Sequence, residues 1–292
     1  ILKDVVTRSQ QMLGYDSNYV PGWDCHGLPI EWKIEEKYRA AGKDKDAVPV
    51  VEFRRECRDF AEHWIGVQRE EFKRLGVEGD WAHPYTTMAY FAEAQIVREI
   101  GKFLMNGGLY KGAKPVLWSV VEQTALAEAE VEYHDHKSAT VWVRFPVTHA
   151  SGPSLRHAAA VIWTTTPWTL PGNRAIAYSG ELEYAVIQVD ETGENSRAVG
   201  PKDGKLGEKL LVAMPLIDDF CQNAGIARHT IVDLFPGSAL AGTVARHPLH
   251  GQGYEFDVPL LPAGFVDATT GTGLVHIAPN AGLDDWELGR AH

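Results

Sequence analysis

The spacing of the apolar residues changes near residue 115, and this change constrains the fold more than any other feature of the chain. Before it, apolar residues recur three and four positions apart, as they do on one face of a helix. After it, they alternate with polar residues or gather in short runs, as they do in strands. The sequence therefore predicts a mixed α/β chain with a mainly helical first part and a β-rich second part.

Two amphipathic helices are predicted in the first part. The apolar positions of the first are Phe53, Cys57, Phe60, Trp64 and Val67, and those of the second are Phe91, Val97, Ile100 and Leu104. Glycines follow both segments, at residue 76 and at residues 107–108, where helices commonly end. We expect both apolar faces to pack on a core and assign them no chemistry.

The second part reads as strands separated by Gly, Pro, Asp and Asn. Over residues 141–147, three valines and a phenylalanine alternate with Trp142 and Arg144, which predicts a half-buried strand. Further apolar runs occupy residues 160–163, 184–189, 210–214 and 231–235. A polar stretch at residues 133–138 separates the two parts, so we place the domain boundary between residues 135 and 136.

The composition excludes several classes of protein. The three cysteines, Cys25, Cys57 and Cys221, are far apart, which argues against a disulfide framework or a zinc ribbon and favours a reducing cytoplasm. No apolar run approaches the ~20 residues of a membrane span. The net charge of −11 argues mildly against nucleic-acid binding, although basic residues can still gather locally.

Residues 22–31 read Gly-Trp-Asp-Cys-His-Gly-Leu-Pro-Ile-Glu, directly after Tyr19-Val-Pro21. This order predicts a strand that runs into a tight bend. Asp24 and His26 then lie at the carboxyl end of the strand, which is where open α/β sheets bind ligands.

Residues 163–173 read Trp-Thr-Thr-Thr-Pro-Trp-Thr-Leu-Pro-Gly-Asn. Four hydroxyls lie at the end of an apolar strand, and the two prolines stiffen the segment. Such a row beside Asn173 can grip ribose and phosphate oxygens or position a water. Threonine is also simply a good strand residue, so the residues alone leave both interpretations open.

Residues 271–285 read Gly-Thr-Gly-Leu-Val-His-Ile-Ala-Pro-Asn-Ala-Gly-Leu-Asp-Asp. His276 falls on a short apolar strand, where a histidine is more often a satisfied core residue than a catalyst. Asp284 and Asp285 precede a helix that one of them can cap. Side chains of adjacent residues diverge, so we expect at most one of the two acids to take part in a site.

Together these stretches resemble the isoleucyl-tRNA synthetases, a family of class I aminoacyl-tRNA synthetases. Residues 22–31 resemble the segment that lines the amino-acid pocket, and residues 163–173 and 271–285 match the two signature stretches of the editing (CP1) domain. Residues 1–38, 117–133 and 240–249 also match. The pair Cys25-His26 and the residue Thr166 favour the isoleucine family, because leucine and valine ligases carry Arg at the position of Thr166.

The resemblance implies a fold for each part. Residues 1–135 are expected to form part of a Rossmann-type catalytic domain with a helical connection. Residues 136–292 are expected to form a β-rich, barrel-like editing domain that continues past His292. The His-Ile-Gly-His and Lys-Met-Ser-Lys-Ser nucleotide-binding motifs are absent from the sequence. We therefore expect that this chain alone forms no aminoacyl-adenylate and that editing is the activity it can retain.

This family must distinguish isoleucine from valine, which is shorter by one methylene. A hydrophobic pocket separates the two by only about 1–3 kcal/mol, or roughly 10–200-fold, a magnitude known for this very pair rather than inferred from this sequence. A second pocket that excludes isoleucine and hydrolyses misattached valine supplies the remaining accuracy. The resemblance thus implies an ATP-dependent isoleucine–tRNA ligase that proofreads valyl-tRNA(Ile).

The resemblance also implies roles for individual residues. Those expected to act in editing are Asp285, which would hold the ammonium of valine, together with Thr165, Thr166 and His276. Those expected to bind the editing substrate are Trp163, Thr164, Thr169 and Asn173. Those expected around the amino acid in the synthetic site are Asp24, which would pair with the ammonium, and Trp23 and Pro21, which would form the wall.

The expected cofactors are ATP and Mg²⁺ for the full-length ligase and none for editing. The expected partners are tRNA(Ile), isoleucine and ATP, in a cytoplasmic monomer without a membrane contact. We expect no metal site, because residues 134–136 alternate and residues 118–122 lack the Cys-x-x-Cys of some relatives. Two alternatives stay open: a module that binds the tRNA acceptor end without hydrolysis, given Ala281 in place of a frequent family histidine, and a valine-specific ligase.

Overall fold

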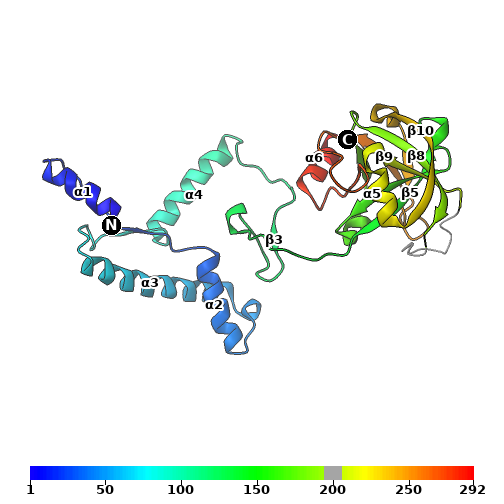
Figure 1. Ribbon diagram of the computed structural model, residues 1–292. Helices are drawn as coiled ribbons and strands as arrows, with labels where there is room; N and C mark the ends of the chain where they lie inside the picture. The colour runs from blue at the N-terminus through cyan, green and yellow to red at the C-terminus, as the bar shows by residue number, and fades with distance from the viewer. Residues whose placement is uncertain (194–205) are drawn as a thin grey trace. The chain divides into compact units, whose positions relative to one another are not determined.

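The computed structural model describes residues 1–193 and 206–292 (Figure 1). The chain divides into two compact units, residues 1–112 and residues 113–292. The boundary between functional domains expected at residues 135/136 stays a prediction. Within the described part of the chain, no helix combines the length and the apolar composition needed to cross a bilayer.

The first unit is mainly helical, as predicted. Its elements are α1 (Leu2–Met12), β1 (Gly22–Trp23), α2 (Leu28–Ala40), α3 (Val50–Arg74), β2 (Tyr85–Thr86) and α4 (Tyr90–Met105). β1 and β2 form a short parallel pair, in which Gly22 lies opposite Tyr85. Gly27, with a φ of 103°, makes the bend between β1 and α2, and Pro29 then occupies the first turn of the helix, where its missing N–H costs no hydrogen bond.

The core of this unit is small. One buried cluster consists of Cys25, Ala61, Ile65 and Met88, with Trp23 and Ile30 packed against them. Further buried apolar residues of this unit are Ile34, Tyr38, Val77 and Ala92. Both predicted helices are present, as α3 and α4. The predicted burial of the α4 face is wrong for the described residues: Phe91 and Val97 are 70% and 67% exposed. The periodicity identified an apolar face correctly, but no described segment covers it.

The second unit is built on a nine-stranded mixed sheet, preceded by a two-stranded hairpin of β3 (Trp118–Ser119) and β4 (Thr124–Ala125). The order across the sheet is β10-β8-β9-β6-β5-β11-β12-β7-β13. The strands are β5 (Val141–His149), β6 (Ala158–Thr164), β7 (Ala175–Tyr178), β8 (Glu183–Thr192), β9 (Lys209–Ala213), β10 (Ile226–Pro236), β11 (Val244–Arg246), β12 (Asp257–Pro262) and β13 (Leu274–Ile277). Two helices accompany them, α5 (Ile217–Ala224) and α6 (Leu283–Ala291). The predicted mixed α/β class and the predicted strands are confirmed.

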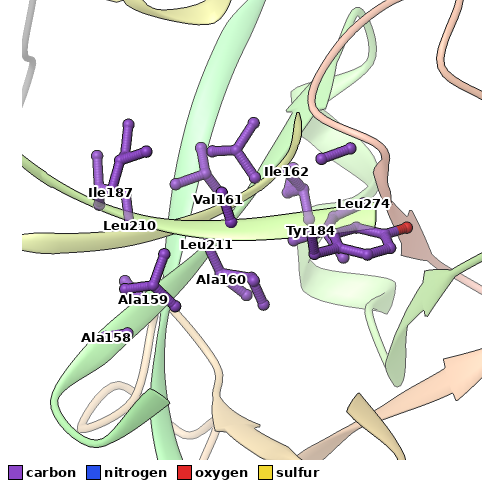
Figure 2. Packing of buried hydrophobic residues seen from close by; sticks show 14 of the residues in the cluster. Ala158, Ala159, Ala160, Val161, Ile162, Tyr184, Ile187, Leu210, Leu211 and Leu274 are labelled. Atoms are coloured by element: carbon purple, nitrogen blue, oxygen red, sulfur yellow. The ribbon is translucent and has the colours of Figure 1, made fainter. Parts of the chain in front are cut away.

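β6 forms the centre of the core. It lies between β5, to which it is antiparallel, and β9, to which it is parallel. Its residues 158–162 are all buried, as expected for a strand that is covered on both faces. Figure 2 shows their side chains near those of Leu210 and Leu211 from the neighbouring β9 and of Tyr184 from β8, the next strand of the sheet. This core anchors the strand end from which the threonine-rich segment leaves.

Tyr184 connects the core to the glycine-rich start of the last motif. Its hydroxyl donates to the carbonyl of Gly273 at 2.6 Å and accepts from the N–H of Ser179 at 3.0 Å. Burial raises the pKa of Tyr184 to about 12, so it remains a donor at any physiological pH. Gly273 has a φ of +70°, and a Cβ there would lie 2.3 Å from the Cβ of Ala213. Only glycine therefore lets this segment approach the sheet and lead into β13.

Candidate functional site

The segment that joins β6 to β7, residues 164–172, forms what we call the threonine turn. It leaves β6 at Thr164 and forms a 3₁₀ helix over Pro167–Gly172. The hydroxyl of Thr164 accepts from the N–H of Thr166 at 3.0 Å and lies 3.2 Å from the hydroxyl of Thr166. Thr165, in contrast, is exposed. The four predicted hydroxyls are therefore not equivalent, because that of Thr164 is used to shape the turn.

Thr169 links the turn to β13. Its hydroxyl lies 2.7 Å from the carbonyl of Thr166 and 2.8 Å from Nε2 of His276. A carbonyl can only accept, so the Thr169 hydroxyl must donate to Thr166 and accept from His276. Nε2 of His276 therefore carries a hydrogen.

Asn173 holds the other side of the same imidazole. Its side-chain nitrogen donates to the carbonyl of Ala175 at 2.9 Å and to Nδ1 of His276 at 2.9 Å. The opposite orientation of the amide would set its oxygen against the Ala175 carbonyl, so the nitrogen is assigned by its partner. Asn173 is fully buried, and its oxygen has no hydrogen-bond partner among the described residues.

His276 is thus held as the neutral Nε2–H tautomer, with both ring nitrogens engaged. Burial lowers its pKa from the ordinary value of 6.5, and His247 lowers it further, while Asp285 acts in the opposite direction. Protonation at Nδ1 would place two donors face to face at Asn173. The ring is therefore both a satisfied core histidine and part of the predicted site, and neither nitrogen is free to accept a proton.

Trp163 is the residue that precedes the threonine turn on β6. A Cβ on Gly271 would lie 3.4 Å from the Trp163 ring, so the start of the second motif packs directly against this side chain. The backbone of Gly271 has a φ of +81°, which L side chains rarely adopt. The two predicted motifs therefore meet at several places, among them Trp163 with Gly271, Thr169 with His276, and Asn173 with His276.

Asp284 and Asp285 point in different directions, as predicted for adjacent residues. Oδ1 of Asp285 accepts from the backbone N–H of Ala278, at the end of β13, at 2.6 Å. Asp284 instead lines an open pocket of about 260 Å³ with Pro262, Ala263, Gly264, Phe265, Glu287 and Leu288. Of the two acids, Asp285 is therefore the one bonded to the end of β13, the strand that carries His276.

The predicted synthetic-site residues lie in the first unit. Asp24 follows β1 at its carboxyl end, as expected, and its Oδ1 accepts from the N–H of His26 at 3.3 Å and from the hydroxyl of Thr87 at 3.4 Å. Trp23 donates from its indole nitrogen to Gln68 at 2.8 Å, and Pro21 is buried. Asp24 is exposed, so its carboxylate is accessible to a ligand.

Two supporting residues are not identified by sequence reasoning. Thr87 accepts from the N–H of Cys25 at 2.8 Å and so holds the bend that carries Asp24. His247 is 1% exposed and contacts the threonine turn through the carbonyl of Leu170. The resemblance covers the Arg-His-Pro segment around it, but nothing in the spacing of that segment indicates where the ring points. Among the described residues, no three His, Cys, Asp or Glu side chains are grouped so that they could hold a metal ion.

Comparison with known proteins decides the family. The family model for tRNA synthetases class I (I, L, M and V) matches residues 1–268, which is most of the chain. The chain belongs to the class I tRNA synthetases. The isoleucine–tRNA ligase of Gluconobacter oxydans is 55% identical over 294 aligned positions, which include 100% of this chain and 30% of that protein. The isoleucine–tRNA ligase of Bradyrhizobium diazoefficiens is 56% identical, and the match covers 100% of this chain and 29% of that protein.

The chain thus spans about 30% of the length of the curated class I synthetases it matches. Among solved structures, a leucyl-tRNA synthetase of Agrobacterium radiobacter K84, in a ternary complex with tRNA and LeuAMS, is 18% identical. The match covers 99% of this chain and 36% of that one, with a TM-score of 0.38. The structure of GlLeuRS-CP1 is 15% identical, and the match covers 51% of this chain and 58% of that one, with a TM-score of 0.38.

Proposed function

We propose that the chain is part of an isoleucine–tRNA ligase and that its second unit hydrolyses valine misattached to tRNA(Ile). Isoleucine is proposed as the amino acid because the relatives that are 55–56% identical over the whole chain are isoleucine–tRNA ligases. The support for editing is the site itself. One hydrogen-bonded network joins the threonine turn to His276, although Thr169 and His276 are 107 positions apart.

That network is the observation on which the editing proposal rests. The network connects three separate elements, which are the end of β6, the 3₁₀ helix and β13, and so holds one face of the proposed site in place. Water can attack an ester only when the two are held in a favourable geometry, and preorganisation supplies much of the rate. Thr165 and Thr166, at the bend, are proposed to position the ester, the terminal ribose or the attacking water.

Asp285 is proposed to receive the ammonium of the valyl group. Its Oδ1 already accepts from Ala278, and a carboxylate has further acceptor sites for a charge-assisted hydrogen bond. His276 and Trp163 are proposed as the walls that limit the length of the side chain. Because both nitrogens of His276 are engaged, its proposed role in editing is to shape the site and not to transfer a proton.

Asp24 is proposed to pair with the ammonium of isoleucine in the synthetic site, with Trp23 and Pro21 beside it. ATP and Mg²⁺ are proposed for the aminoacylation reaction of the whole ligase. The residues assigned in this chain are those that would hold the amino acid and the ester.

Deacylation of valyl-tRNA(Ile) and isoleucyl-tRNA(Ile) tests the proposal in the full-length protein that carries this sequence. The protein should clear valine and spare isoleucine. Asp285→Ala should lose this discrimination. The matched control is Asp284→Ala, which should retain it because Asp284 lines the open pocket beside Phe265 instead. If Asp285→Ala still clears valine and spares isoleucine, the assignment of Asp285 is wrong. Binding of the tRNA acceptor end without cleavage would instead support the binding-module alternative.

A further inference from the structure

A second buried histidine holds the threonine turn. His247 follows β11, and its Nε2 lies 2.9 Å from the carbonyl oxygen of Leu170, inside the 3₁₀ helix. The same carbonyl also accepts from the backbone N–H of Asn173, at 3.0 Å, which closes the last turn of that helix. The two lone pairs of Leu170 are therefore both used, one to shape the turn and one to anchor it.

The tautomer of His247 is fixed by its partners. The backbone N–H of Leu249 points at Nδ1 at 3.1 Å, so that nitrogen must accept. The Leu170 carbonyl can only accept, so Nε2 must donate. His247 is consequently the neutral Nε2–H form, and burial lowers its pKa from the ordinary value.

Aromatic side chains fix the orientation of the ring. Tyr254 stacks on His247 with centroids 4.7 Å apart and an interplanar angle of 14°. Phe145 meets it edge-on at 6.0 Å, and Phe256 lies 5.4 Å away. Because the imidazole is enclosed and both its nitrogens have partners, it cannot turn without breaking a hydrogen bond. It is a rigid support for the Leu170 carbonyl.

We propose that His247 is a positioning residue of the editing site, which sets the Leu170 carbonyl and through it the placement of Thr169 against His276. This inference rests on the proposed editing function. Thr169 is adjacent to Leu170, and its hydroxyl joins Thr166 to His276 over 2.7 and 2.8 Å. Such short contacts tolerate little displacement, so loss of the anchor at Leu170 loosens the turn. His247 is 1% exposed, so its proposed action is through the turn and not by contact with the substrate.

Three variants separate the hydrogen bond from the packing. His247→Gln keeps a donor near the position of Nε2, His247→Asn keeps a polar group only near Nδ1, and His247→Phe keeps the aromatic packing alone. In the full-length protein we expect kcat for deacylation of valyl-tRNA(Ile) to fall roughly tenfold in the Asn and Phe variants, as for loss of one buried hydrogen bond. The Gln variant should recover most of it, and KM should stay nearly constant in all three.

A purely structural role is tested by a matched control. Ile187→Val removes one methyl group from the core and is expected to be moderately destabilising without touching the turn (Figure 2). The proposal is overturned if Ile187→Val and His247→Phe have equal melting temperatures and lose the same deacylation rate. It is also overturned if His247→Gln deacylates no faster than His247→Asn.

A second readout does not depend on activity. Nitrogen-15 spectra report the tautomer of His276, and hydrogen exchange reports protection of the Asn173 backbone amide. In His247→Phe we expect the Asn173 amide to exchange at least tenfold faster and the His276 signals to shift. Unchanged spectra and exchange overturn the positioning role even if the protein proves to have no deacylase activity. A wild-type protein that leaves valyl-tRNA(Ile) intact refutes the proposed function instead.

Discussion

The side-chain nitrogen of Asn173 donates to Nδ1 of His276 over 2.9 Å, and 103 positions separate the two residues in the chain. This bond agrees with the one between Nε2 and Thr169, and together the two set the tautomer of the imidazole, with Nε2 as a donor to Thr169. It also explains how a fully buried residue can belong to a site. The Asn173 side chain bonds His276 and the Ala175 carbonyl, while its backbone N–H bonds the Leu170 carbonyl of the threonine turn.

Replacing Asn173 should therefore lower the stability of the second unit. Asn173→Ala leaves the Ala175 carbonyl and Nδ1 of His276 buried without a donor, so we expect the free energy of unfolding to fall by about 1–3 kcal/mol. Denaturant unfolding measures this change. Asn223→Ala removes two exposed hydrogen bonds to Asp219 within α5 and should stay within about 0.5 kcal/mol of wild type. Equal losses in the two variants would contradict the buried network.

The two buried histidines predict a pH dependence of stability. Burial lowers the pKa of His276 and of His247 in the folded state, below the ordinary value of 6.5. As the pH falls through about 6.5, the unfolded chain binds protons first, which stabilises the unfolded state. The free energy of unfolding is therefore highest above this range, decreases as the pH falls towards the folded-state pKa values, and levels off below them.

Unfolding titrations at about pH 7.5, 6.5 and 5.5 measure this slope. The double variant His247→Gln, His276→Gln lacks both imidazoles and should show a flatter profile across the same range. A double variant that is as steep as wild type would assign the pH dependence to other groups.

Gly282 should be indispensable for the placement of Asp285. A Cβ at this position would lie 2.4 Å from Oδ2 of Asp285, while the backbone of Gly282 is extended and accepts any residue. Gly282→Ala should therefore displace the carboxylate and reduce deacylation of valyl-tRNA(Ile) roughly tenfold. Gly152→Ala is the control, because nothing lies within 4 Å of its added Cβ. A Gly282→Ala protein with normal rate and discrimination would count against Asp285.

Thr87 should tune the synthetic site through Asp24. Its hydroxyl joins the N–H of Cys25 to Oδ1 of Asp24, so Thr87→Val removes both contacts without changing the size of the side chain much. We expect the KM for isoleucine in pyrophosphate exchange by the full-length ligase to rise roughly tenfold. Thr230→Val removes a comparable bond to Asp190 in the other unit and should leave this KM unchanged. A change in kcat alone would argue for a different role.

Much of the fold could be predicted because apolar periodicity reports local structure. The spacing that begins at Phe53 and the alternation that begins at Val141 gave α3 and β5 their correct types. The same signals could not identify what covers an apolar face. Phe91 and Val97 have the spacing of a buried helix and are exposed in the described part of the chain. Periodicity is a property of one helix or strand, whereas burial also requires a second segment that packs against it.

The sequence motifs predicted which segments carry the candidate site, but not how their residues are connected. Trp163, the threonines, His276 and Asp285 were identified by motif resemblance, and the structure brings most of them together. The direction of each hydrogen bond depends on pairings between distant residues, which no local pattern encodes. His247 was missed for this reason, because its partner, Leu170, lies 77 positions away.

The threonine turn joins two strands that are not neighbours in the sheet. β6 and β7 are separated by β5, β11 and β12 in the order of strands, and the turn must bridge them directly. A residue gained or lost here would shift one part of the sheet against the other and break the register of β7 with β13. Related proteins are therefore free to alter the chemistry of this segment by exchanging side chains, but its length should stay constant.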